Sequence, residues 1–208
     1  KAIPSFLDYN GYPASICTSI NEEVVHGIPS DRVILKDGDV LSVDCGLILD
    51  GWQSDSAFTV GVGNVSPEDQ KLINVTEECF FKGVRKALNG NHLGDIGHAV
   101  QTYAESFGYG VIRDLTGHGI GRNMHEEPSV PNFGREGHGV KLRPGMTLAI
   151  EPMIAKGDYH VAELEDGWTV VTEDSSVCSH YEHTIVINEN GLPELLSYPG
   201  FALTEEEE

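Results

Sequence analysis

Closely spaced cysteines are missing from this sequence, which carries four cysteines in 208 residues and no CxxC pair: Cys17, Cys45, Cys79 and Cys178. Structural zinc sites and disulfide scaffolds both depend on such spacing, so neither is indicated. The sequence also lacks any run of about 18 apolar residues, and its first residues do not form the apolar core of a signal peptide. These absences predict a soluble protein of the reducing cytoplasm, with no contact to a membrane.

Basic residues are also scarce. Lys and Arg number 13 against 33 Asp and Glu, which gives a formal net charge of −20 at pH 7. A surface of that charge repels nucleic-acid phosphates and anionic membranes, so neither is an expected direct ligand. Four of the negative charges form the run 205–208, which we expect to be a solvated acidic tail and not a site.

The length and the 39% hydrophobic content allow one substantial core. The sequence shows neither an internal repeat nor a low-complexity linker. We therefore expect a single catalytic domain over residues 1–204, with one active site.

Local patterns predict a fold of class α+β. Two apolar, β-branched runs, 40–49 and 52–60, flank the turn dipeptide Asp50-Gly51 and indicate a hairpin. Helical spacing of apolar residues follows from Pro67 to about Leu88, and a second helix is expected from Leu93 or Gly94 to about Phe107. Further strands are predicted at 147–154, 168–172 and 181–188, while the glycine-rich 116–121 is not assigned to a strand. Helices between antiparallel strands favour α+β over a doubly wound parallel sheet.

Asp44 and Asp55 are the first candidates for a functional site. Pairing across the two-residue turn places Asp55 opposite Gly46. Because side chains alternate along a strand, Asp44 and Asp55 become diagonal neighbours on one face, with backbones about 7 Å apart. A solvated strand face is the ordinary place for an aspartate, but the flanking residues make both faces of this hairpin look buried. Two buried carboxylates repel unless a cation lies between them, so we predict metal ligation.

Three more candidates lie downstream. The segment 117–121 lacks the GxGxxG spacing of a dinucleotide loop, and its glycines instead allow His118 to approach a ligand closely. Glu151 and Glu182 each lie in apolar or β-branched runs, where an uncompensated carboxylate is costly, although either glutamate alone could be salt-bridged. Four carboxylates and one histidine suit a hard, dinuclear site. Two metals about 3.5 to 4 Å apart can share a hydroxide and polarise a carbonyl, so hydrolysis is the expected reaction.

The motifs occur in order along nearly the whole chain: His26-Gly27-Ile28-Pro29, Asp44, Asp55, Gly117-His118-Gly119-Ile120-Gly121, His125-Glu126-Glu127-Pro128, Glu151-Pro152-Met153 and Tyr181-Glu182-His183-Thr184. Together they resemble the methionine aminopeptidase family. The resemblance implies the pita-bread α+β fold, in which antiparallel sheets enclose a dinuclear metal site and helices lie outside. Only 30 residues separate Glu151 from Glu182, which favours type I, because type II members carry a helical insertion there.

The resemblance also implies roles for individual residues. The implied metal ligands are Asp44, Asp55, His118, Glu151 and Glu182, with Asp55 and Glu182 bridging the two ions. Glu151 is also the general-base candidate. His26 and His125 would contact the scissile peptide and stabilise its tetrahedral intermediate. The two divalent ions are not identified, since Co, Mn, Fe, Zn and Ni all accept this ligand set.

A pocket for the methionine side chain is implied as well, with walls that suit a thioether: Phe6, Tyr9, Tyr12, Cys17, Met124 and Trp168. Ordinary core packing is the alternative for each of these residues taken singly. The commonest bacterial pattern has Cys at the position of Phe6 and Phe at that of Met124, so the pocket of this chain has its own shape. Family members carry helices before the segment 4–6, so we expect such leading helices to be missing from this chain or to form a separate piece.

The implied function is removal of the initiator methionine from nascent proteins, with preference for a small second residue. The implied partners are the N-termini of nascent polypeptides, in transient proximity to the ribosome, and we expect a monomer. Two alternatives share the fold. A proline-specific dipeptidase or aminopeptidase P is disfavoured by the aromatic and sulfur pocket and by segment 165–169, and a binding protein without catalysis is disfavoured because all five ligands are present.

Overall fold

The predicted hairpin is the longest pair of strands in the fold. The computed structural model describes residues 1–204, and the run 205–208, with the prediction made for it, lies outside the described residues. β4 (Val40–Leu49) and β5 (Trp52–Gly61) pair antiparallel over their whole length. The turn residues Asp50 and Gly51 have positive φ angles of 52° and 77°, as a tight two-residue hairpin requires. The register places Asp55 opposite Gly46, which confirms the predicted pairing.

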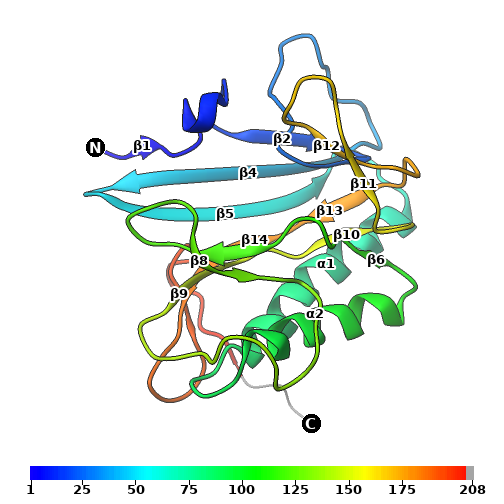
Figure 1. Cartoon of the computed structure of the whole chain (residues 1–208). Helices are drawn as coiled ribbons and strands as arrows, with labels where there is room; N and C mark the ends of the chain where they lie inside the picture. The colour runs from blue at the N-terminus through cyan, green and yellow to red at the C-terminus, as the bar shows by residue number, and fades with distance from the viewer. Residues whose placement is uncertain (205–208) are drawn as a thin grey trace.

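The hairpin belongs to a nine-stranded sheet whose order is β1-β4-β5-β14-β9-β7-β8, with β2 added to β4 and β15 added to β14. The hairpin therefore lies beside a strand from the other end of the chain (Figure 1). The pairs in this sheet are antiparallel. The remaining strands are β1 (Ile3–Pro4), β2 (Cys17–Ile20), β7 (Gly117–Gly119), β8 (Glu126–Val130), β9 (Thr147–Ile150), β14 (Glu182–Val186) and β15 (Glu194–Leu195).

Two smaller antiparallel sheets adjoin the large one. The first has the order β13-β10-β6 and the second has the order β11-β12-β3. A short 3-10 turn, Tyr9–Gly11, lies between β1 and β2. The six strands are β3 (Glu23–Val25), β6 (Gly110–Val111), β10 (Met153–Ala155), β11 (Val161–Glu163), β12 (Val170–Thr172) and β13 (Cys178–His180).

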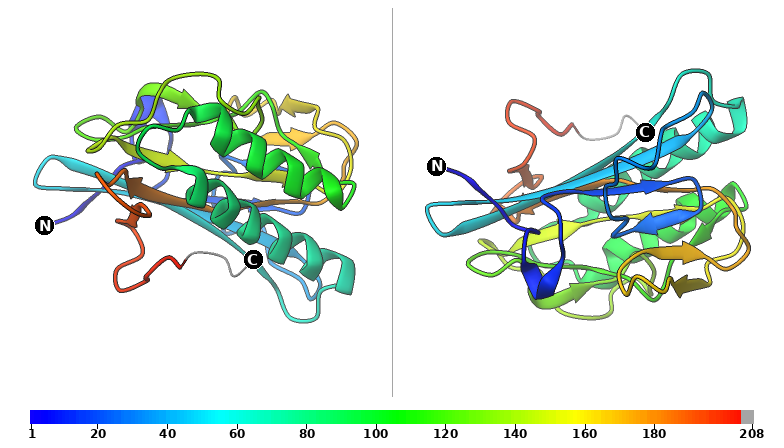
Figure 2. Two further views of the ribbon diagram at one scale, coloured as in Figure 1. Left: turned by 90° about the horizontal axis from the view of Figure 1, so that it is seen from below. Right: turned by 90° about the horizontal axis from the view of Figure 1, so that it is seen from above.

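Both predicted helices are present and cover one side of the large sheet. They are α1 (Pro67–Lys86) and α2 (Leu93–Ser106), and Figure 2 shows both in front of the sheet when the molecule is seen from below. The Ser66 side chain caps α1 by accepting the Asp69 N–H at 3.1 Å. Phe80 of α1 is fully buried against Leu148 and Ile185 of the sheet. Burial of such side chains contributes about 1.5–3 kcal/mol each and holds helices and sheet together. The α+β class is confirmed, and no helix within residues 1–204 is long and apolar enough to cross a membrane.

Two strand predictions need correction. The predicted strand 147–154 is two strands in different sheets, because β9 ends at Ile150 and β10 begins at Met153. Pro152 has no N–H for a ladder hydrogen bond, so pairing stops there and Glu151 is left between the strands. The glycine-rich segment, in contrast, contains β7 inside the large sheet. A Cβ at Gly117 would collide with the carbonyl oxygen of Ala149, so only glycine lets the two strands approach this closely.

Candidate metal centre

Five neighbouring parts of the sheet system carry the predicted ligands. Asp44 lies on β4, Asp55 on β5, Glu182 at the start of β14, Glu151 directly after β9, and His118 on β7. These strands follow one another in the sheet order, so residues far apart in the chain meet along a single line across the sheet. Asp55 and Glu182 are central in that line, with Asp44 on one side and His118 and Glu151 on the other.

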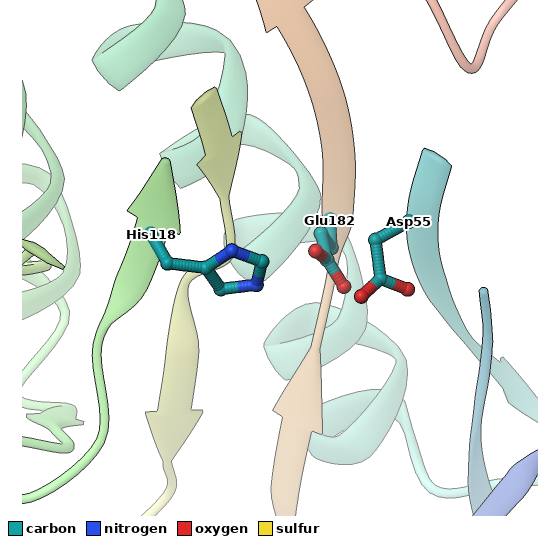
Figure 3. Close-up of side chains that lie close together, drawn as sticks. All are labelled: Asp55, His118 and Glu182. Carbon is teal, nitrogen blue, oxygen red and sulfur yellow. The ribbon is translucent and has the colours of Figure 1, made fainter. Parts of the chain in front are cut away.

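The centre of this arrangement is tight. One ligand atom each from Asp55, His118 and Glu182 lies within 4.8 Å of the other two. Figure 3 shows the two carboxylates facing each other and the imidazole turned towards them. Glu151 extends the group, since its Oε1 lies 3.6 Å from Nε2 of His118. Asp44 lines the same cavity as these four side chains, so the five predicted ligands share one cavity wall.

The tautomer of His118 is defined by its surroundings. Its Nδ1 lies 2.8 Å from the carbonyl oxygen of Gly119, which can only accept, so Nδ1 carries the proton. Burial lowers the pKa of His118 to about 4, so the ring is neutral at neutral pH. Nε2 therefore presents a lone pair towards the carboxylates, as a metal-ligating histidine must.

The four carboxyl groups lie in an environment that disfavours their charge. Burial raises the pKa of Asp55 to about 7. Burial, followed by the negative charge of neighbouring carboxylates, raises the pKa of Asp44, Glu151 and Glu182 well above the ordinary range. Asp44 Oδ1 and Glu182 Oε1 are buried without a hydrogen-bond partner. A cation compensates both the crowded charge and the orphaned oxygens, so this donor set fits a divalent metal centre.

The backbone around the central pair is held by hydrogen bonds across strands. Thr184 Oγ1 accepts the N–H of Asp55 at 3.0 Å and donates to the carbonyl oxygen of Asp55 at 3.0 Å. Thr184 and Glu182 share a face of β14, since they are two residues apart. This side chain therefore fixes β5 against β14 at the level of the two carboxylates.

A cavity of about 260 Å³ opens onto the five donors. Its walls include every residue predicted for the methionine pocket, both histidines predicted to contact the substrate and, in addition, Asn10. Phe6, Tyr12, Cys17 and Met124 form a buried apolar cluster, against which Tyr9 and Trp168 pack. The Tyr12 hydroxyl donates to the carbonyl oxygen of Gly27 at 2.8 Å and so ties the pocket to the His26 loop.

His26 and His125 lie at the edge of the metal centre. The His125 ring packs on the His118 ring with centroids 4.3 Å apart, and its Nδ1 is 2.7 Å from the Tyr9 hydroxyl. Burial lowers the pKa of His125, while burial and the charge of His125 lower the pKa of His26. Both rings are therefore neutral at neutral pH and can each offer one N–H.

His180 belongs to the same region, although the sequence did not single it out. The side chain is 2% exposed, its Nε2 has no hydrogen-bond partner, and it lies 3.9 Å from Oε2 of both Glu151 and Glu182. Burial lowers the pKa of His180 to about 3. Its position two residues before Glu182 was the available signal, because residues i and i+2 of an extended segment share a face.

Comparison with known proteins agrees with the geometry. Residues 4–189 match the profile of metallopeptidase family M24. A methionine aminopeptidase of Clostridium acetobutylicum is 60% identical over 197 residues, which span 95% of this chain and 78% of that protein. The crystal structure of methionine aminopeptidase from Thermotoga maritima superimposes with a TM-score of 0.92 at 48% identity, over 94% of this chain and 78% of that one.

A more distant likeness concerns the fold alone. The prolidase of Pyrococcus horikoshii superimposes with a TM-score of 0.70 at 23% identity, over 91% of this chain and 49% of that structure. Structures named methionine aminopeptidase and prolidase thus share this pita-bread architecture, so the fold does not distinguish between the functions considered above.

Proposed function

The chain belongs to metallopeptidase family M24, and we propose that it acts there as a type I methionine aminopeptidase, a metal-dependent exopeptidase that removes the initiator methionine from proteins. The observation that carries this proposal is the direct opening of the apolar, sulfur-containing pocket onto the five metal-binding side chains. A methionine side chain in that pocket would place its own peptide bond beside the donors. The decisive assay is release of free methionine from Met-Ala-Ser after chelation and metal-by-metal restoration.

In this proposal the metal ligands are Asp44, Asp55, His118, Glu151 and Glu182. When bound, two divalent ions supply Lewis-acid activation of the scissile carbonyl and of a water. Their identity is not fixed by this donor set, which accepts Co, Mn, Fe, Zn or Ni. The buried, unpartnered oxygens of Asp44 and Glu182 support the assignment, since each would gain a partner.

The other residues of the cavity bind the substrate and move its protons. Glu151 takes the proton of the attacking water and passes it to the leaving amine, because its carboxyl group lies beside the His118 Nε2 at the chemical centre. His26 and His125 donate hydrogen bonds to the reacting peptide and to the negative charge that develops on its oxygen. The apolar walls bind the methionine side chain and exclude water.

We predict a preference for a small residue after methionine. The second residue must pass between His26 and His125, which both line the cavity near the donors. A bulky side chain there would displace the imidazoles from the scissile bond, and displacement of reacting groups by about 1 Å can reduce turnover by about 100-fold. The kcat/KM values of Met-Ala-Ser and Met-Arg-Ser measure this preference, and similar values for the two peptides would contradict it.

The nearest rival function, that of a proline-specific dipeptidase, is tested by adding Xaa-Pro peptides to the substrate panel. A proline-specific dipeptidase would cleave Xaa-Pro substrates and ignore the methionine side chain. The cluster of Phe6, Tyr12, Cys17 and Met124 supports methionine, because sulfur and aromatic walls make favourable contacts with a thioether. Cleavage of Leu-Pro in preference to Met-Ala-Ser would reverse the assignment.

Metal binding should stabilise the protein more at about pH 8 than at about pH 5.5. Folding raises the pKa of Asp55 from 3.8 to about 7. The free energy of unfolding of the metal-free protein therefore falls as pH rises from 3.8 to about 7, and this loss of stability is complete at higher pH. A divalent ion offsets that cost and competes with fewer protons at the higher pH. Differential scanning calorimetry with and without added Mn²⁺ measures the shift in Tm, and equal shifts at both pH values would contradict the prediction.

The cellular context is part of the proposal. We place the protein in the cytoplasm as a monomer acting on the N-termini of nascent polypeptides, in transient proximity to the ribosome. Free thiols at all four cysteines fit a reducing compartment. The net charge of −20 disfavours direct contact with nucleic acid or with an anionic membrane.

A further inference from the structure

A hydrogen bond joins the methionine pocket to the substrate-contacting histidine. The Tyr9 hydroxyl lies 2.7 Å from Nδ1 of His125, and the two rings are tilted with centroids 5.4 Å apart. Tyr9 is thus more than a pocket wall, because its polar end reaches a side chain 116 positions away in the sequence.

The backbone holds Tyr9 in place for this contact. Tyr9 begins the 3-10 turn and lies between Asp8 and Asn10, which have positive φ angles of 64° and 51°. The Tyr9 N–H donates to the carbonyl oxygen of Phe6 at 2.9 Å, and the Asp8 N–H donates to that of Tyr12 at 2.9 Å. Phe6 and Tyr12 belong to the buried pocket cluster, so these two hydrogen bonds hold the turn against a buried part of the structure.

The chemistry of the two groups favours one direction for this bond. A phenol is a good hydrogen-bond donor and a weak acceptor, whereas an unprotonated imidazole nitrogen is a strong acceptor. The favoured arrangement therefore has the phenol as the donor and Nδ1 as the acceptor. A neutral imidazole carries one N–H, so an accepting Nδ1 leaves the proton on Nε2.

We propose that Tyr9 is a positioning residue that holds His125 in the tautomer with Nε2 protonated. This inference rests on the proposed function and deepens it, because the Nε2–H of His125 matters only if His125 donates a hydrogen bond to the reacting peptide. In the opposite tautomer Nδ1–H would point at the phenol oxygen, and Nε2 would carry a lone pair that repels the negative charge developing on the peptide oxygen. The hydroxyl of Tyr9 thus keeps the donor of His125 available for the reaction, while its ring forms part of the methionine pocket.

The first test is spectroscopic and needs no substrate. The protein is labelled with ¹⁵N-histidine and loaded with diamagnetic Zn²⁺, and long-range ¹H–¹⁵N spectra distinguish protonated from unprotonated ring nitrogens. The His125→Gln variant assigns the signal. We expect Nδ1 of His125 to be unprotonated and Nε2 protonated. A protonated Nδ1 in the unmodified protein would overturn the proposal.

The second test removes only the hydroxyl. In Tyr9→Phe, both ring nitrogens of His125 should shift towards the values of a tautomer mixture, and kcat should fall about tenfold, as expected for one lost hydrogen bond. KM should change less than about twofold, because the aromatic ring that contacts the thioether is kept. A purely structural role in the pocket would instead raise KM and leave the ¹⁵N shifts unchanged, and that outcome would also overturn the proposal.

Tyr159→Phe is the matched control. Tyr159 also stacks on a histidine, His160, with ring centroids 4.3 Å apart, but it does not line the cavity. The Tyr159→Phe variant should leave the His125 signal, kcat and KM unchanged. If the unmodified protein released no methionine, the proposed function would fail, while the nitrogen shifts would still decide whether Tyr9 sets the tautomer.

Discussion

Replacement of Asp55 by asparagine, or of Glu182 by glutamine, is expected to abolish methionine release. Each amide keeps the shape of the side chain but loses the charge that would hold the cations at the centre of the site. The loss in kcat/KM should exceed about 100-fold, the upper range for residues that merely orient ligands. Elemental analysis of the purified variants should show reduced metal content in parallel with the lost activity.

The same variants should not damage the fold. The carboxyl groups of Asp55 and Glu182 are buried, and burial raises the pKa of both, so an uncharged amide removes a cost that the metal-free protein bears. Metal-free Asp55→Asn should therefore unfold at the same temperature as the metal-free parent, or higher. Glu163→Gln, an exposed acid on β11, is the control that should change nothing. Turnover within tenfold of the parent for either site variant would refute the two-metal assignment.

Replacement of His125 by alanine should lower kcat by about 100-fold or more while metal content stays unchanged. A donor to a developing oxyanion contributes about 3 kcal/mol in comparable sites, which corresponds to that factor. His125 lies against His118, and its Nδ1 is already hydrogen-bonded to the Tyr9 hydroxyl at 2.7 Å. A sixth protein ligand would occupy a position that the substrate needs.

The measurement pairs single-turnover kinetics with elemental analysis of the same preparations. His98→Ala, on α2, is the control for removal of an imidazole away from the cavity. It should leave both quantities unchanged. If His125→Ala lost metal in parallel with activity, His125 would belong to the ligands and the division of roles proposed here would be wrong.

Some of the structure follows from local sequence alone. The turn Asp50-Gly51 takes up positive φ angles that glycine and aspartate tolerate, and this sets the register of the whole hairpin. The register in turn places Asp44 and Asp55 on one face, so half of the carboxylate group could be positioned without a tertiary structure. The start of α1 was similarly predictable, because Ser66 is a side-chain cap and Pro67 suits the first helical position.

Other features depend on contacts between distant segments. β7 has neither alternation nor β-branched residues, and its glycines become part of a strand only because the carbonyl groups of β9 and β8 come too close for any side chain. A pattern search finds no strand there, since the reason lies in the neighbouring backbones. Glu151 was expected inside one long strand, yet it lies at the break where the chain leaves one sheet for another.

The sequence by itself determined which side chains were available for chemistry. It contains four acids in apolar surroundings, a histidine between glycines and a set of aromatic and sulfur-bearing residues, and local rules of turn and helix capping place several of them. Only the tertiary structure decided how these groups meet. The strand order that brings β5, β14 and β7 together, the approach of His180 to Glu151 and the hydrogen bond from Tyr9 to His125 all join residues far apart in the chain. Such contacts depend on the packing of whole sheets, and no local periodicity encodes them.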